Sequence, residues 1–179
     1  MKAKSKKTDG GGKLIASFQV DHTRIGYGIF VSRRDIVNGA FVTTFDIRMK
    51  RPNVEPAIHP NAMHTIEHLV ATYLRNSPFK DHVVYWGPMG CLTGCYFITS
   101  TSHEIMPREI APLMRRAFRH VASYQGEVPG ATPVNCGNYL LHDLPMAKFE
   151  AKEFISKEWS FEYPPARRVK AGRRVFFDA

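Results

Sequence analysis

What this sequence lacks narrows its class before any motif is considered. No hydrophobic run approaches the ~18 residues that a membrane-spanning helix requires, and the N-terminus shows no signal peptide. The chain has only three cysteines, and none of them forms a CxxC pair. An odd number of cysteines without such a pair argues against a disulfide framework and for a reducing compartment. We therefore predict a cytoplasmic protein without a membrane partner.

Positive charge is in excess, but it is concentrated at the two ends of the chain. The net charge is +9, of which residues 1–13 and 161–179 together carry +7. The residues between them are nearly neutral and contain neither an RNA-binding aromatic motif nor a helix-turn-helix pattern, so no nucleic-acid partner is expected. We predict a disordered basic N-terminal tail over residues 1–13, a catalytic domain over residues 14–160 and a basic C-terminal extension over residues 161–179.

The middle of the chain mixes strand-like and helix-like patterns. A chain of 179 residues buries roughly 70% of its unfolded surface, which is enough for a real core. The patterns predict strands over residues 15–20, 27–31, 40–48, 83–86 and 95–100, and helices over residues 61–75, 108–124 and 146–159. This mixture predicts an α+β fold, a single domain in which an antiparallel sheet packs against helices. The arginines of the second helix are interpreted as a solvated face: Arg108, Arg115, Arg116 and Arg119.

The most informative stretch is His64-Thr65-Ile66-Glu67-His68, an HxxEH sequence. On a helix, two histidines four residues apart project from the same face, so their imidazoles can hold one metal ion. Glu67 lies on the same side, close enough to move protons beside that ion. Two ordinary histidines would also fit the pentapeptide. The apolar residues of the helix lie on its other side, however, and this favours a metal site.

A catalytic metal site requires a third protein ligand and an open position, and the cysteines are the candidates. Cys136 lies in a polar, glycine-containing turn where a thiolate could meet a metal. Cys91 lies in a tight glycine-containing loop, where turn N–H groups can lower the pKa of an accessible thiol. Cys95 is followed by three apolar residues and is interpreted as a buried strand residue. From the residues alone, each of the three could equally be a small core hydrophobe.

Several motifs, taken as a set, resemble the S-ribosylhomocysteine lyase family (LuxS, the quorum-sensing autoinducer synthase). They occur in that family's order over roughly residues 15–160. The motifs are Ser17-Phe18 with Asp21-His22, Phe45-Asp46-Ile47-Arg48, the HxxEH stretch with Leu69, Pro88-Met89-Gly90-Cys91 with Thr93-Gly94, Cys136-Gly137 and His142-Asp143-Leu144. The resemblance implies a bacterial, cytoplasmic homodimer of small α+β subunits with active sites at the subunit interface. It implies cleavage of S-ribosylhomocysteine to homocysteine and 4,5-dihydroxy-2,3-pentanedione, the precursor of a bacterial quorum-sensing signal.

The resemblance also implies a role for individual residues. It makes His64, His68 and Cys136 the ligands of one divalent metal ion per subunit, with Fe(II) expected in the cell and Zn(II) or Co(II) as substitutes. It makes Glu67 and Cys91 the catalytic acid/base pair. It assigns Ser17, His22 and Arg48 to the substrate pocket.

The residue types fit the chemistry of that reaction. Moving a carbonyl along the sugar and then expelling a thiolate requires repeated proton removal and return, which a thiolate and a carboxylate on different sides of the sugar can perform. A divalent ion can polarise the sugar oxygen and stabilise the developing charge. The chain departs from the family at Tyr85, six residues before the catalytic cysteine, where an aspartate that helps to hold the substrate is usual. This departure leaves the substrate affinity and specificity open.

Two other classes share part of the pattern. An inverted-motif zinc metallopeptidase also carries HxxEH, but that class needs a downstream glutamate as third ligand and is usually much larger. A non-catalytic module could use the metal only to staple its fold. A structural zinc site is normally closed by four protein ligands, and the sequence offers three convincing ones.

Overall fold

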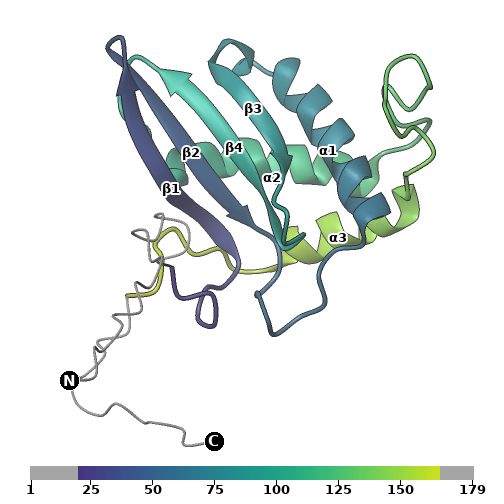
Figure 1. Cartoon of the computed structure of the whole chain (residues 1–179), viewed down its shortest axis with the longest axis horizontal. Helices are drawn as coiled ribbons and strands as arrows, with labels where there is room; N and C mark the ends of the chain where they lie inside the picture. The colour runs from purple at the N-terminus through teal and green to yellow at the C-terminus, as the bar shows by residue number, and fades with distance from the viewer. Residues whose placement is uncertain (1–19, 166–179) are drawn as a thin grey trace, which may run out of the picture.

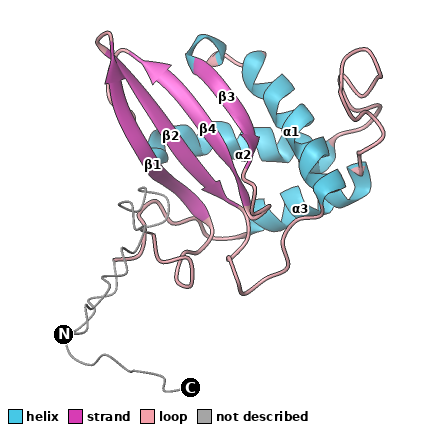
Figure 2. Ribbon diagram, in the orientation of Figure 1, coloured by secondary structure: helices cyan, strands magenta, loops and turns pink. Residues whose placement is uncertain are grey.

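The computed structural model describes residues 20–165, which form a four-stranded antiparallel sheet with helices packed on one face (Figures 1 and 2). The elements are β1 (Gly28–Val37), β2 (Ala40–Arg48), α1 (Pro60–Arg75), the short 3₁₀ turn η2 (Lys80–His82), β3 (Val83–Pro88), β4 (Gly94–Thr101), α2 (Pro107–Ser123) and α3 (Leu144–Ser156). The strand order in the sheet is β1-β2-β4-β3. This arrangement confirms the predicted α+β domain. Within the described residues, no helix is long and apolar enough to cross a bilayer.

Strand β1 is longer than the sequence pattern predicted. The prediction ended at residue 31 because the next four residues are polar, yet the strand continues to Val37 and pairs with β2 as far as Val37 opposite Ala40. Asn38 and Gly39 join the two strands with φ angles of 50° and 81°. An Asn-Gly pair adopts such left-handed angles readily and makes the tight turn that suits a two-residue hairpin. The Asn-Gly dipeptide indicates a hairpin turn at this point, whereas the apolar pattern alone does not show that β1 continues to it.

Most other boundaries agree with the sequence. Strand β2 has the predicted bounds, β3 and β4 differ by at most two residues, and α1 and α2 each begin one residue early. Helix α3 begins earlier than predicted because Asp143 caps its first turn through a 2.9 Å bond from the Met146 amide, and it also ends earlier, at Ser156. Trp159 therefore lies beyond the helix. The strand predicted over residues 15–20 falls outside the described residues, apart from Val20 in a bend.

The core lies between the sheet and the helices, and it fixes the orientation of α1. Alternate residues of β2 and β4, among them Phe45, Ile47 and Phe97, are fully buried. Met63, Ile66, Leu69 and Val70 of α1 are buried in the same cluster. Fully burying a large apolar side chain stabilises the fold by about 1.5–3 kcal/mol. The apolar stripe of α1 is therefore held inward, and the histidines and glutamate of HxxEH occupy the other side.

After α3 the chain returns to the sheet and lies along β1. Ser160 forms a parallel bridge with Gly28, through a 2.9 Å bond from the Ile29 amide to the Ser160 carbonyl and another from the Ser160 amide to the Tyr27 carbonyl. A Cβ on Gly28 would lie 2.0 Å from that Ser160 carbonyl oxygen, so only glycine permits this approach. The backbone bridge holds the residues on either side of Ser160 against the domain.

The aromatic residues of this returning segment correct the interpretation of the α2 arginines. The Arg115 guanidinium lies 4.1 Å from the centre of the Trp159 ring, and that of Arg108 lies 4.6 Å from the centre of the Phe161 ring. Arg115 also donates to the Ile155 carbonyl at 3.1 Å. Arg108, Arg116 and Arg119 are exposed as predicted, and Arg115 is half-buried. Arg108 and Arg115 nevertheless hold the segment through cation–π stacking.

Candidate metal centre and the adjoining active site

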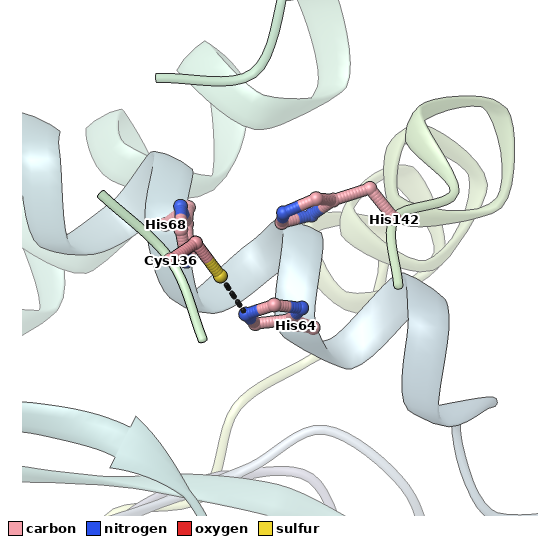
Figure 3. A group of neighbouring side chains, drawn as sticks. All are labelled: His64, His68, Cys136 and His142. Carbon is pink, nitrogen blue, oxygen red and sulfur yellow. Dashed lines mark hydrogen bonds between the residues drawn. The ribbon is translucent and has the colours of Figure 1, made fainter. Parts of the chain in front are cut away.

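Four side chains converge at the outer side of α1 (Figure 3). His64 and His68 project from the helix, and Cys136 and His142 come from the loop between α2 and α3. Their donor atoms all lie within 4.8 Å of one another, and the Cys136 Sγ is 3.4 Å from the His64 Nε2. Imidazoles and thiolates are ligands that Zn(II) and Fe(II) accept, so this set of three imidazoles and one thiol fits a metal ion.

Hydrogen bonds to backbone carbonyls set the orientation of both helix histidines. The Nδ1 of His64 donates to the Leu141 carbonyl at 2.7 Å, and the Nδ1 of His68 donates to the Pro129 carbonyl at 2.8 Å. A carbonyl can only accept, so each ring carries a proton on Nδ1, and Nε2 is the nitrogen left to meet a metal ion. Hydrogen bonds of this kind hold metal-ligating histidines in the productive tautomer.

His142 is oriented in the same way by Thr65. The Thr65 hydroxyl donates to the Asn61 carbonyl at 2.9 Å and accepts from the Asp143 amide at 2.9 Å. Its remaining lone pair faces the Nδ1 of His142 at 3.2 Å, so that nitrogen carries the proton. The Nε2 of His142 is buried and has no partner among the described residues, which is the state of a donor atom prepared for a ligand.

The sequence did not identify His142 as a donor. It lies in the His142-Asp143-Leu144 motif, far along the chain from HxxEH, and its ring stacks on that of His64 with centroids 4.2 Å apart. Burial, followed by the charges of His64 and His68, lowers the pKa of His142 to about 4. The ring therefore stays neutral at physiological pH and keeps its lone pair available.

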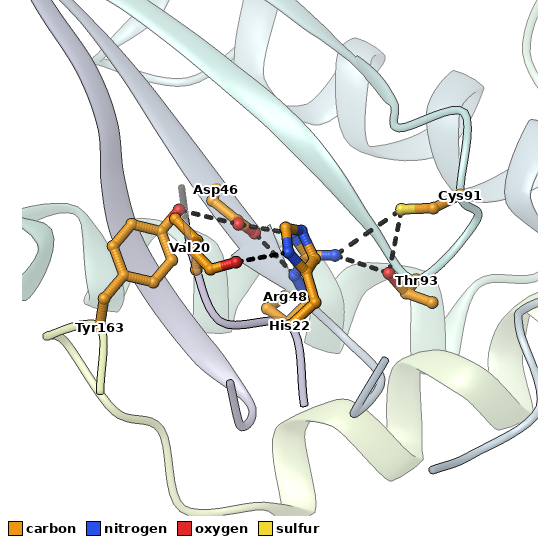
Figure 4. A network of polar contacts seen from close by, with 7 residues as sticks. All are labelled: Val20, His22, Asp46, Arg48, Cys91, Thr93 and Tyr163. Carbon is orange, nitrogen blue, oxygen red and sulfur yellow. Dashed lines mark hydrogen bonds and ion pairs between the residues drawn. The ribbon is translucent and has the colours of Figure 1, made fainter. Parts of the chain in front are cut away.

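A second polar cluster lies beside the metal site and is built around Arg48 (Figure 4). We call it the Arg48 network: Tyr163, Asp46, Arg48, Thr93 and Cys91. Asp46 and Arg48 alternate along β2, so both side chains leave the same face of the sheet. The guanidinium pairs with both Asp46 oxygens, at 3.1 and 2.6 Å, and both side chains are buried. The fork geometry leaves Nη1 to point at the loop that carries Cys91.

The far end of the Arg48 network activates the Cys91 thiol. Arg48 Nη1 donates to the Thr93 hydroxyl at 2.6 Å and approaches the Cys91 Sγ at 3.7 Å. Because Thr93 accepts from Arg48, its own proton is free to point at the sulfur 3.1 Å away. Burial is the largest single influence and opposes ionisation, but the Thr93 hydrogen bonds and the Arg48 charge outweigh it and lower the pKa of Cys91 below its ordinary value. Cys91 is also exposed, so the thiol is accessible as predicted.

A pocket of about 260 Å³ adjoins His64 of the donor cluster and Leu92 of the loop that carries Cys91. Its α1 wall includes His64 and Glu67, and its other wall includes Pro88 and Leu92, the latter adjacent to Cys91 in sequence. The remaining lining residues are Pro60, Met63, Asn138 and Leu141. A carboxylate and the loop of an activated thiol thus face a common space next to a possible metal ion, which is the arrangement that proton transfer at a metal-held carbon acid requires.

Comparison with known proteins gives the family. The sequence model of the S-ribosylhomocysteinase (LuxS) family matches residues 15–163. The chain belongs to this family. An S-ribosylhomocysteine lyase of Phocaeicola vulgatus is 58% identical over 144 residues, covering 80% of this chain and 88% of the relative. Lyases of the same name from Porphyromonas gingivalis and Borreliella burgdorferi are 52% and 42% identical, over 84% and 85% of this chain and 98% and 99% of theirs.

The remaining residues that the sequence analysis singled out differ in burial and position. Cys95 is fully buried beside the Met63 sulfur at 3.5 Å, and burial raises its pKa well above the ordinary value, which confirms it as a core residue. His22 lies in the loop before β1 and donates to the Val20 carbonyl at 2.8 Å. Tyr85 is 45% exposed on the edge strand β3. Ser17 lies outside the described residues.

Proposed function

We propose that this protein is a metal-dependent lyase that cleaves S-ribosylhomocysteine to homocysteine and 4,5-dihydroxy-2,3-pentanedione, an autoinducer precursor. The proposed route is aldose–ketose isomerisation followed by β-elimination of the homocysteine thiolate. The observation that carries the proposal is the pocket that adjoins both the imidazole–thiol donor cluster and the loop of an activated thiol. The names of the relatives supply the substrate.

The proposed metal ligands are His64, His68 and Cys136, and the proposed ion is Fe(II), with Zn(II) or Co(II) as substitutes. The bound ion supplies Lewis acidity, polarising a sugar oxygen and stabilising the negative charge that develops when a neighbouring proton leaves. The hydrogen bonds from His64 and His68 to backbone carbonyls support this assignment, because they direct both Nε2 lone pairs at one point.

Glu67 and Cys91 are the proposed proton-transfer pair. Thr93 and Arg48 favour the thiolate of Cys91, which is the form that acts as a base, and lower its pKa. Glu67 lines the pocket from the α1 side and can return a proton to the other side of the sugar. Neither residue is needed to hold the metal, so their removal should separate catalysis from metal binding.

Arg48, His22 and Ser17 are the proposed substrate-binding residues. Arg48 is proposed because its guanidinium approaches the Cys91 sulfur and donates to Thr93, in the loop where the substrate would meet the thiol. We further propose a homodimer that shares its active sites between subunits. A stable obligate interface of this kind buries about 2,000 Å² or more.

One observation favours a second candidate, a non-catalytic module in which the metal only staples the fold. His142 adds a fourth donor to the cluster, and four protein ligands are typical of closed structural sites. The two candidates differ in a single measurable respect, because only the lyase turns over substrate.

The deciding experiment is a free-thiol assay on the full-length protein reconstituted anaerobically with Fe(II). Release of homocysteine from S-ribosylhomocysteine supports the lyase. Stoichiometric bound metal without thiol release supports the stapled module instead. Casein cleavage in a parallel reaction would indicate the metallopeptidase that the HxxEH sequence also allows.

A further inference from the structure

Tyr163 connects the C-terminal segment to the proposed catalytic thiol. Its ring stacks on Phe30 of β1, with centroids 4.6 Å apart and planes 10° from parallel. Its hydroxyl donates to the Asp46 Oδ2 at 2.9 Å, across 117 positions of sequence (Figure 4). The Ser160–Gly28 bridge, three residues earlier, fixes the backbone from which the tyrosine extends. The contact is thus anchored on both sides.

The Tyr163 hydroxyl bonds to the carboxylate of Asp46, which receives few other hydrogen bonds from the described residues. Asp46 is buried, and Arg48 contributes one bond to each of its oxygens. A buried carboxylate is costly unless its lone pairs are satisfied, and Tyr163 satisfies a further one at Oδ2. Burial, together with the charge of Asp46, raises the pKa of Tyr163, so its proton stays in place as a donor.

We propose that Tyr163 is a positioning residue that holds the Asp46–Arg48 pair in register with Cys91. The proposal rests on the assigned catalytic role of Cys91. The hydrogen bonds of the Arg48 network are contiguous. Tyr163 and Arg48 both donate to Asp46, Arg48 also donates to Thr93, and Thr93 directs its proton to Cys91. Polar chains of this kind polarise one another and depend on every member.

The effect of losing the Tyr163 hydroxyl has a definite sign. Without this hydroxyl, the negative charge of Asp46 is stabilised by Arg48 alone among the described side chains, and Asp46 binds the guanidinium more strongly. The guanidinium then stabilises the thiolate of Cys91 less, so the pKa of Cys91 rises. The other ionisable groups that act on this site are Tyr96 and Cys95 of β4, with Glu67 of α1 acting on Cys95. None of these groups changes in a Tyr163 variant, so a shifted ionisation of Cys91 reports on Tyr163.

The test compares Tyr163→Phe with Tyr27→Phe in the metal-loaded, full-length protein. Tyr27→Phe is the matched control, because it removes a tyrosine hydroxyl that bonds to Glu55, outside the Arg48 network. Cys91 is alkylated with iodoacetamide across a pH series and identified by peptide mass spectrometry. In Tyr163→Phe, alkylation at pH 7 should slow by about 3- to 10-fold, the range that one hydrogen bond contributes, with its inflection at higher pH. Tyr27→Phe should match the parent protein.

Thiol release and a Tyr163→Leu variant complete the design. The kcat/KM of Tyr163→Phe should fall by a similar factor at unchanged metal content. An unaltered alkylation profile in Tyr163→Phe beside an altered one in Tyr163→Leu would mean that the ring only packs on Phe30, and would overturn the proposal. The alkylation measurement needs no turnover, so absent thiol release in the parent protein would reject the lyase assignment while leaving the Tyr163 result readable.

Discussion

The two cysteines of the β3–β4 region give the sharpest test of the proposed site. Cys91 is exposed in the loop and lies in the Arg48 network, whereas Cys95 is fully buried on β4 beside Met63. The same substitution, Cys→Ala, should therefore affect turnover at Cys91 and stability at Cys95, although the two positions are only four residues apart. Cys91→Ala should reduce turnover by ~10²–10⁴-fold, the usual contribution of one general acid or base, at unchanged metal content.

The expected cost at Cys95 is one of stability. Removing a single buried heavy atom from a core costs about 0.5–1.5 kcal/mol, by comparison with Ile→Val changes. For a chain of this length, each kcal/mol lowers Tm by about 2–4 °C, so Cys95→Ala should melt about 1–6 °C below the parent protein. Its thiol-release rate at 25 °C should stay close to that of the parent, because it has no part in proton transfer.

The assay pairs thiol release with thermal melting and metal analysis on all three proteins. Equal loss of turnover in the two variants would refute the assignment, since it would show that the loss follows from disturbed packing. Full activity in Cys91→Ala would refute it as well and would return Cys91 to a structural role. The stable, metal-loaded but inactive state is expected of Cys91→Ala alone.

Four further outcomes are expected. Cys136→Ser should lower the bound metal well below one ion per chain, because serine replaces a thiolate ligand with a weak one; unchanged stoichiometry by elemental analysis would remove Cys136 from the ligand set. Sedimentation at low micromolar concentration should give an active dimer, and an active monomer of about 20 kDa would contradict the shared-site proposal. The pKa of Cys91 is lowered below 9.0, so its thiolate and its alkylation should persist to lower pH than those of an ordinary thiol. Thr93→Val removes the hydroxyl that donates to the sulfur and should move the alkylation inflection to higher pH; an identical pH profile would show that Thr93 does not act on the thiol.

The parts of the site that the sequence alone determined depend on local geometry. Two histidines four residues apart share a helix face whenever that segment is helical, and the apolar stripe of α1 predicted both the helix and its outward side. The sequence pattern likewise predicted the bounds of β2, and the apolar run after Cys95 predicted the burial of that thiol. In each case the informative residues lie within one turn or a few positions of each other.

Tertiary structure decided the contacts that join distant segments. His142 faces the HxxEH helix through Thr65 across 77 positions, Arg48 reaches Cys91 across 43, and Tyr163 reaches Asp46 across 117. No periodic pattern records such a pairing, because it arises only when the core sets the sheet, the helices and the returning C-terminal segment in place. The sequence therefore supplied the chemical groups, and the packing of the core decided which of them could meet.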